Sequence, residues 1–460
     1  MNKSHHLLEG NITKSITKMA LPLMGIAFIQ MAYTLVDLIW LGRLSTAAVA
    51  AVGTCGFFVW MAQAITLITK TGMSVGLSQA YGRRDEEAIT KTTISGFQVN
   101  LVLCIILMSI FIIFRKPLYE FYGLEKAVEK LALEYHMVIS WGLIFTFLNP
   151  FFAAIFYSQG NSSTPFKVSV IALVFNIIAD PILIFGIGPF PELGMAGAAV
   201  ATVMAQAIGT ILYIYIGVKY GEYYAKINYF KSLTPRYIIQ TIRLGLPASI
   251  QSLVHSLIGI KLNQYIAIYG AVGVATYAVG SQIESISWMS SEGFATAFTS
   301  FFGQNYGAKN FDRLDKAKKI CIRLTLGIGL LGTAIMIFGN KFLFRIFTPN
   351  DPAVIAEGSK YLIILGLTSA LMALEIGTGG MLNGLGLTKY PAINAIVLNA
   401  ARIPIAYFLM KLLGLTGIWV TMSLSGALKG IVIIIIFKYI ERRTNGFRNN
   451  MEKFQRGVRS

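Results

Sequence analysis

Long apolar blocks alternate with short polar connections along almost the whole chain. Each block is long enough to cross a bilayer as a helix, which takes about 20 predominantly apolar residues. The pattern predicts twelve transmembrane spans, at residues 18–42, 50–78, 95–114, 133–157, 165–187, 195–218, 242–268, 273–302, 320–339, 360–383, 390–410 and 415–438. We therefore predict an all-α integral membrane protein whose twelve helices form two pseudo-symmetric six-helix bundles.

The two halves of the chain repeat one another. Leu21-Pro22 opens the first span and Leu246-Pro247 opens the seventh. Gln-Ala-Tyr-Gly at 79–82 follows the second span, and Gln-Asn-Tyr-Gly at 304–307 follows the eighth with the same offset between the copies. Repeated halves in a membrane chain are typical of transporters whose bundles move around a site between them. The predicted organisation is a cytoplasmic N-terminal segment (1–17), an N-lobe (18–220), a cytoplasmic linker (221–241), a C-lobe (242–438) and a basic cytoplasmic tail (439–460).

Composition excludes a soluble globular protein. The chain is 55% hydrophobic and 13% charged, with a mean hydropathy of +0.64. The first residues carry charges but no apolar core, so we expect no cleaved signal peptide. The three cysteines have no paired spacing and predict neither a zinc site nor a disulfide framework.

The net charge is +18, and the pattern predicts that most of the basic residues lie at one membrane face. Most of the 39 Lys and Arg residues lie in alternate connections, on the same side as the N-terminus. The positive-inside rule then places both termini in the cytoplasm and the protein in the inner (plasma) membrane, with the tail facing anionic headgroups. No nucleic-acid reading motif accompanies these charges, so we expect no nucleic-acid partner.

Ionisable residues inside spans are the strongest indications of function, because each is costly unless it faces the bundle interior or a cavity. Asp37 lies in the first span, one turn after Tyr33. Asn176 and Asp180 are four residues apart in the fifth span, and Thr202 ends a run of small residues in the sixth. Together these oxygens suit Na⁺, or a proton, because two neighbouring carboxylates cannot both ionise cheaply. The structural alternative is that Asp37 and Asp180 only cap or bridge helices.

The second half has no acidic counterpart of Asp37 or Asp180, but it carries ionisable residues of both signs: His255, Lys261, Glu284, Glu292, Glu375 and Arg402. Mutual pairing, for example of Glu375 with Arg402, is the structural explanation. The functional alternative is a second ion or substrate site formed by His255, Glu284, Glu375 and Arg402. The sequence contains no P-loop and no metal-binding His or Cys spacing, so we expect neither an enzyme nor a cofactor.

Local signals predict how the connections fold. Gly82 and Gly307 are expected to end their helices in the left-handed conformation. The outer connections 115–130 and 342–360 are expected to form short surface helices. The aromatic and basic residues of 219–243 fit either an interfacial segment or a plain solvated linker.

Taken in order, these motifs resemble the multidrug and toxic compound extrusion (MATE) family. The resemblance runs over residues 14 to 440 and rests on the two Leu-Pro openings, the two Gln-x-Tyr-Gly endings, Val36-Asp37, Asn176-x-x-x-Asp180-Pro181 and Gly-Ala-Ala-x-Ala-Thr ending at Thr202. It implies a secondary-active exporter that exchanges Na⁺ or H⁺ for amphipathic, cationic small molecules. The chain is most similar to the prokaryotic DinF-like branch, whose cation site lies in the N-lobe.

By motif match, the resemblance gives the cation-site roles to Asp37, Asn176, Asp180 and Thr202, with Tyr33 and Tyr135 as proton-network neighbours. It implies a monomer in the lipid bilayer. The branch that uses the C-lobe has an acidic residue in span seven where this chain has His255, so the resemblance argues against a cation site in the C-lobe. A lipid-linked saccharide flippase, a class of similar architecture, is the alternative function. It would require a basic cavity for pyrophosphate, with Arg402 and Lys261 pointing into it.

Overall fold

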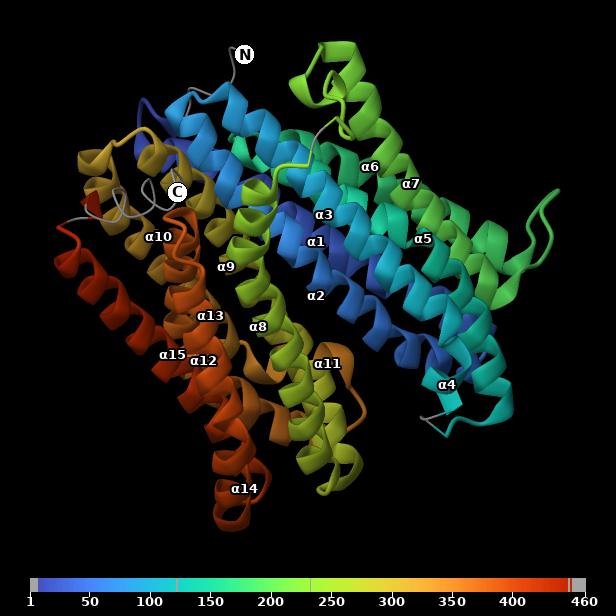
Figure 1. Cartoon of the computed structure of the whole chain (residues 1–460). Coiled ribbons are helices and arrows are strands. Elements are labelled where there is room, and N and C mark those ends of the chain that lie inside the picture. Colours follow the sequence, from blue (N-terminus) through green and yellow to red (C-terminus); the bar gives the residue numbers. More distant parts are fainter. Residues whose placement is uncertain (1–6, 121–122, 232, 446, 449–460) are drawn as a thin grey trace. The chain divides into compact units, whose positions relative to one another are not determined.

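The computed structural model of the chain describes residues 7–120, 123–231, 233–445 and 447–448, and nearly all of these residues are helical (Figure 1). The contacts divide them into two compact units. The N-unit comprises Gly25–Leu77 and Asp85–Ser249. The C-unit comprises the described residues up to Met24, Ser78–Arg84, and those from Ile250 onward. Each unit is described by itself below.

The helices follow the predicted spans. The long ones are α1 (Ile12–Leu44), α2 (Thr46–Arg83), α3 (Glu86–Ile113), α5 (Lys126–Ser158), α6 (Ser163–Phe185), α7 (Gly194–Tyr220), α8 (Pro235–Ala267), α9 (Gly270–Gly307), α10 (Phe311–Phe338), α12 (Pro352–Gly384) and α15 (Leu415–Arg443). Between them lie α4 (Arg115–Glu120), η2 (Tyr223–Ala225), α11 (Asn340–Phe347), α13 (Lys389–Ala400) and α14 (Arg402–Leu413). The predicted all-α class is confirmed. α4 and α11 are the short helices expected in the connections 115–130 and 342–360.

Ten helical segments of the described chain are long and apolar enough to cross a membrane, with α13 and α14 counted as one. α8 and α9 coincide with the predicted seventh and eighth spans. At 33 and 38 residues they are long enough to cross, but neither contains an 18-residue stretch that is apolar and uncharged enough to count among the ten. The outermost parts of the predicted N-terminal segment and of the basic tail, residues 1–6 and 449–460, lie outside the described residues.

The eleventh span was predicted as one helix over 390–410, and the structure divides it at Ala401 into α13 and α14. Pro404 stands in the first turn of α14, where it has no N–H to bond the carbonyl of Ala400. The interruption places Arg402 at the start of α14 instead of in the middle of a continuous helix.

The ends of α2 and α9 differ from the prediction for their glycines. The left-handed residues are Arg84 (φ 58°) and Lys309 (φ 60°), so the predicted role of Gly82 and Gly307 as left-handed stops is wrong. Both glycines still lie within their helices. Their repeated spacing in the two halves therefore has a structural reason other than backbone conformation.

That purpose is close packing of the two helix ends within the C-unit. A Cβ atom on Gly82 would lie 2.0 Å from the carbonyl oxygen of Gln304, and one on Gly307 would lie 2.1 Å from the carbonyl oxygen of Gln79. No side chain fits at such distances, so only glycine allows α2 and α9 to approach this closely. The side chain of Gln79 also donates to the carbonyl of Gly384 at 3.0 Å.

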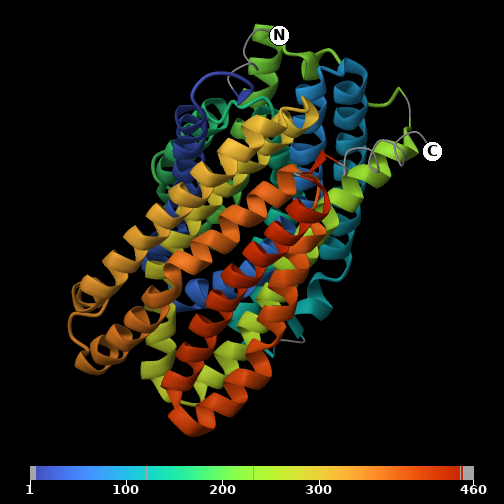
Figure 2. The same ribbon diagram turned by 90° about the vertical axis from the view of Figure 1, so that its left-hand side faces the viewer.

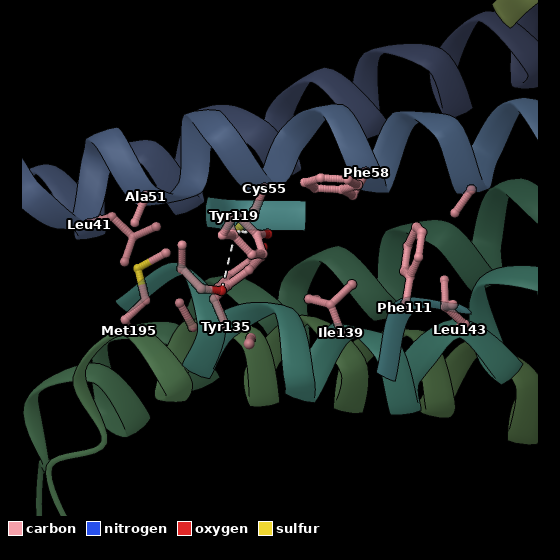
Figure 3. Packing of buried hydrophobic residues seen from close by; sticks show 14 of the residues in the cluster. Leu41, Ala51, Cys55, Phe58, Phe111, Tyr119, Tyr135, Ile139, Leu143 and Met195 are labelled. Carbon is pink, nitrogen blue, oxygen red and sulfur yellow. Dashed lines mark hydrogen bonds between the residues drawn. The ribbon is translucent and has the colours of Figure 1, made fainter. Parts of the chain in front are cut away.

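The N-unit has a large buried core between α2, α3 and α5 (Figure 3). Tyr119 connects α4 to this core. Its hydroxyl lies 3.0 Å from the Cys55 sulfur and 3.0 Å from Nδ1 of His136, and its ring packs edge-on against Phe58. These contacts hold the short helix against the bundle.

The connection that follows α7 packs on the N-unit and is not a plain solvated linker. Tyr224 is 2% exposed, and its hydroxyl donates to the carbonyl of Tyr213 at 2.7 Å. Tyr229 donates in turn to the carbonyl of Tyr224 at 2.7 Å, and the Tyr223 hydroxyl lies 3.0 Å from that of Thr93. Aromatic burial with satisfied hydroxyls holds Tyr223, Tyr224 and Tyr229 of this connection against the N-unit.

In the C-unit, α12 is the central helix. It packs against α9, α10 and α15, and its course beside α15 is visible in Figure 2. Trp419 of α15 is fully buried against Tyr361 of α12, with ring centroids 4.9 Å apart, and its indole N–H donates to Glu357 at 3.0 Å.

Candidate functional site

The structure brings together the four residues predicted for the N-lobe site. Asp37 comes from α1, Asn176 and Asp180 from α6, and Thr202 from α7, all within the N-unit. The Thr202 hydroxyl donates to Oδ2 of Asp37 at 3.5 Å, and the Asn176 amide donates to Oδ1 of Asp180 at 3.0 Å. The carboxyl groups of Asp37 and Asp180 also interact with each other.

Small residues let the three helices come close enough for these short side chains to meet. A Cβ on Gly197 of α7 would lie 2.3 Å from the carbonyl oxygen of Leu183 in α6. A Cβ on Gly25 of α1 would lie 2.4 Å from the ring of Phe166 at the start of α6. Close backbone approach through small residues is the usual way in which membrane helices associate.

Proline modifies α6 directly beside the site. Pro181 follows Asp180 within the continuous helix, and it has no N–H for the carbonyl oxygen of Ile177. Such a carbonyl needs another partner, and near a polar site a cation is one such partner.

Three oxygens of this cluster lack a donor. Oδ1 of Asp37, Oδ1 of Asn176 and Oδ2 of Asp180 are buried and have no hydrogen-bond partner among the described residues. Asn176 and Asp180 are both 0% exposed. Leaving buried acceptors unsatisfied costs about 1–3 kcal/mol each. A cation or a proton among these oxygens removes that cost.

The chemical types of the ligand atoms in this cluster also indicate which ion would fit. The described residues contain no group of three or more His, Cys, Asp or Glu placed to hold a metal ion. The N-unit cluster offers two carboxylates, one amide and one hydroxyl instead. All of these are hard oxygen ligands, which suit a hard cation such as Na⁺ better than a transition metal that prefers nitrogen or sulfur ligands.

Tyr33 and Tyr135 are neighbours of this cluster. Both interact electrostatically with Asp37 and with Asp180. In the described part of the chain neither hydroxyl is hydrogen-bonded to a carboxylate of the pair. They are therefore electrostatic neighbours of the two carboxylates and not hydrogen-bonded members of the cluster.

The charged residues of the C-unit are arranged differently from the expectation. Glu375 pairs with Lys429, Nζ to Oε2 at 2.9 Å, and not with Arg402. The two side chains are 11% and 10% exposed. Arg402 instead donates through Nε to the Ser425 hydroxyl at 2.9 Å. Lys429 was missed as a site residue, although its position inside an apolar span was a visible signal that it needed a carboxylate partner.

The other two residues of the possible C-lobe site have partners of their own. His255 Nδ1 lies 3.5 Å from the Asn399 amide, and Glu284 accepts a 2.9 Å hydrogen bond from the Tyr361 hydroxyl. A cavity of about 30 Å³ lies beside Glu284, Arg402 and Lys429. That volume holds about one or two water molecules. Partners outside the set, only one of which forms an ion pair, therefore account for these four residues without a bound cation.

Lys429→Met is expected to destabilise the protein by about 3–5 kcal/mol, because it leaves the buried Glu375 carboxylate without its counter-charge. The double variant Lys429→Met/Glu375→Gln should recover part of this loss. Thermal unfolding of the purified protein in detergent measures both effects. Lys360→Met is the control, because Lys360 is 60% exposed in its pair with Glu357 and exposed pairs contribute only about 0–1 kcal/mol. Equal melting temperatures for Lys429→Met and wild type would contradict the structural role of the pair.

Comparison with known proteins adds to this geometry. The model of the MatE family matches residues 22–182 and 247–408, one match in each half. The chain is 29% identical over 418 residues to a probable multidrug resistance protein, NorM, of Thermotoga maritima, covering 89% of each chain. It is 25% identical to a probable multidrug resistance protein, YoeA, of Bacillus subtilis, covering 94% of this chain and 95% of that one.

A solved structure shows the same fold. It is an outward-facing multidrug resistance MATE family transporter of the MOP superfamily, with a TM-score of 0.90, 24% identity, and coverage of 97% of this chain and 99% of that one. The predicted MATE-type fold is thereby confirmed. With the family match spanning both repeated halves, the chain belongs to the MatE family of multi-pass membrane transporters, and it is not an enzyme.

Proposed function

We propose that this protein exports amphipathic, mainly cationic small molecules in exchange for H⁺ or Na⁺ entering at the N-unit cluster. Export of drug-like small molecules is supported by relatives that carry the name multidrug resistance protein. The entry site of the ion is supported by the converging oxygens of Asp37, Asn176, Asp180 and Thr202.

One observation carries the ion-coupled part of the proposal: three buried oxygens of this cluster have no donor. A cation or proton that binds these oxygens in the apolar bundle lowers the free energy of the folded protein. If the occupied and empty clusters favour different shapes of α1 and α6, ion binding shifts the equilibrium between those shapes. Exchange follows when substrate favours the shape that the ion disfavours.

H⁺ and Na⁺ would compete for the same oxygens. A proton on one carboxyl group removes its charge and occupies a lone pair that Na⁺ would use. Raising the proton concentration should therefore weaken Na⁺ binding, with Asp37 and Asp180 behaving as one coupled pair.

The experiment is transport of a fluorescent cationic dye, ethidium, in proteoliposomes under a pH gradient alone, a Na⁺ gradient alone, or neither. We expect at least one gradient to drive the dye against its concentration difference, and an ionophore that collapses that gradient to stop it. Dye movement at the same rate with and without both gradients would contradict ion-coupled export. Empty liposomes give the background rate.

The flippase alternative has less support from the C-unit. The buried Arg402 and Lys429 are accompanied by Glu284 and Glu375, so this region carries no excess positive charge. Lys261 is exposed, with its ammonium over the ring of Tyr265 at 5.2 Å. A pyrophosphate group beside Arg402 and Lys429 would meet the carboxylates of Glu284 and Glu375 as well as these two cations.

The orientation, the division into lobes and the oligomeric state belong to the same proposal. We place both termini in the cytoplasm because the basic connections lie on their side of the plasma membrane. The protein is proposed to work as a monomer of two lobes, 18–220 and 242–438, joined by the linker 221–241.

A further inference from the structure

A basic hollow of about 500 Å³ lies at one end of the C-unit, where α1 and α10 begin and shortly after α15 ends. Its cationic lining residues are Lys309, Arg313, Lys316 and Arg448. Since these three helices are spans, their ends lie near the boundary between hydrocarbon and water. The hollow therefore lies at the level of lipid headgroups.

The positive charge of the hollow is only partly neutralised. Asp312 pairs with Arg448 at 3.4 Å, and Glu9 interacts electrostatically with Arg313. Lys309 and Lys316 form no ion pair with any carboxylate in the described part of the chain, and both are exposed. Two positive charges thus remain at one hollow.

The wall of the hollow is fixed by the chain itself. The Arg313 guanidinium donates to the carbonyl oxygens of Leu7 at 3.2 Å, Glu9 at 2.8 Å and Gly10 at 2.9 Å. The Asn305 amide also donates to the Leu7 carbonyl, at 3.0 Å. These bonds hold the segment before α1 against the start of α10, so the hollow needs no ligand to form.

The start of α10 adds to the attraction for an anion. This helix of 28 residues begins at Phe311, and its N-cap residue Asn310 makes no side-chain capping bond. The unsatisfied N–H groups and the dipole of a helix N-terminus favour a negative group. Here that terminus opens into a cavity with uncompensated lysines.

We propose that the hollow binds the phosphate-bearing headgroup of an anionic phospholipid from the leaflet that it faces. Lys309 and Lys316 would contact the phosphate, while Ile12 and Phe311, which also line the hollow, would contact the first acyl carbons. Position favours a lipid over a soluble phosphate, because a headgroup at this level brings apolar chains to the apolar part of the lining. The site is independent of the proposed exchange of ion and drug.

Native mass spectrometry of the purified full chain tests this with phosphatidylglycerol and with phosphatidylcholine. Wild type should retain phosphatidylglycerol in preference to phosphatidylcholine. The variant Lys309→Gln/Lys316→Gln should retain it about 30-fold less, because each lysine near an anionic surface contributes about fivefold. The control Lys341→Gln/Arg345→Gln removes two exposed charges from α11 instead and should behave as wild type.

Equal retention of phosphatidylglycerol by wild type and the lysine variant would overturn the proposal. So would displacement of the lipid by equimolar glycerol 3-phosphate or inorganic phosphate, which would identify a soluble phosphate as the occupant. If the lysine variant does not fold, the salt dependence of lipid binding to the wild type tests the proposal instead. Raising the salt concentration should release phosphatidylglycerol but not phosphatidylcholine, and equal salt sensitivity would overturn the proposal as well. Loss of dye export in the transport assay has no bearing on these outcomes.

Discussion

Asp180→Asn is expected to reduce ion-driven export to the background of empty liposomes while the protein remains folded. The side chain keeps its shape, and the amide oxygen can still accept the 3.0 Å hydrogen bond from Asn176. What is lost is one of the two negative charges that would surround the ion under the proposed exchange. Removing a charged ligand weakens such an interaction by about 3 kcal/mol, or roughly 100-fold in affinity. Asp37→Asn should act similarly, and Thr202→Val less, because only a neutral ligand is removed.

Glu134→Gln is the matched control for this prediction. Glu134 lies on α5 of the same unit, next to Tyr135, and it is exposed, so the same chemical change is made outside the cluster. The assay is dye transport under the gradient that drives the wild type, at equal protein per liposome. Melting temperatures verify the fold. If Asp180→Asn exports dye as fast as Glu134→Gln, Asp180 does not hold the driving ion.

Gly82→Ala is expected to destabilise the protein by about 3 kcal/mol, and Gly307→Ala by a similar amount. The added methyl group would lie 2.0 Å from the Gln304 carbonyl oxygen in one case and 2.1 Å from that of Gln79 in the other. Both obstacles are backbone atoms, so a change of rotamer cannot relieve them and the helix ends must separate. A lower apparent melting temperature in detergent, or loss of folded protein from the membrane, measures the effect.

Gly53→Ala on the same helix α2 makes the same change where no atom lies within 4 Å of the new Cβ. It should be neutral or slightly stabilising, since alanine restricts the unfolded chain. The double variant Gly82→Ala/Gly307→Ala should cost less than the sum of the single variants, because one separation of the helix ends relieves both clashes. Melting of Gly82→Ala at the wild-type temperature would show that this contact is not close in solution.

The sequence was sufficient to predict the parts of the fold that depend on local chemistry. The spans follow from apolar length, and the cluster of Asp37, Asn176 and Asp180 follows from polar groups at helical spacing inside them. Ion pairs between side chains far apart in the sequence were harder to predict. Glu375 has both Arg402 and Lys429 as opposite charges in spans, and only the packing of α12 on α15 selects Lys429.

The two glycine motifs show a second limit of sequence interpretation. A glycine near a helix end is compatible with a left-handed stop or with close approach of another backbone. Gly82 and Gly307 serve the second purpose, while Arg84 and Lys309 adopt the left-handed conformation despite having side chains. Tertiary contacts determine which of the two roles these glycines have, and the local sequence does not distinguish between them.

The contact between the ends of α2 and α9 is reciprocal. Gly82 meets Gln304 while Gly307 meets Gln79, so each motif supplies the same two groups to the other. This is the isologous arrangement by which identical subunits meet across a two-fold axis. The motif is therefore present twice because each copy is one half of a self-complementary interface, which a single copy could not form. Asp37 and Asp180 are under no such geometric requirement, and one half of the chain can carry them alone.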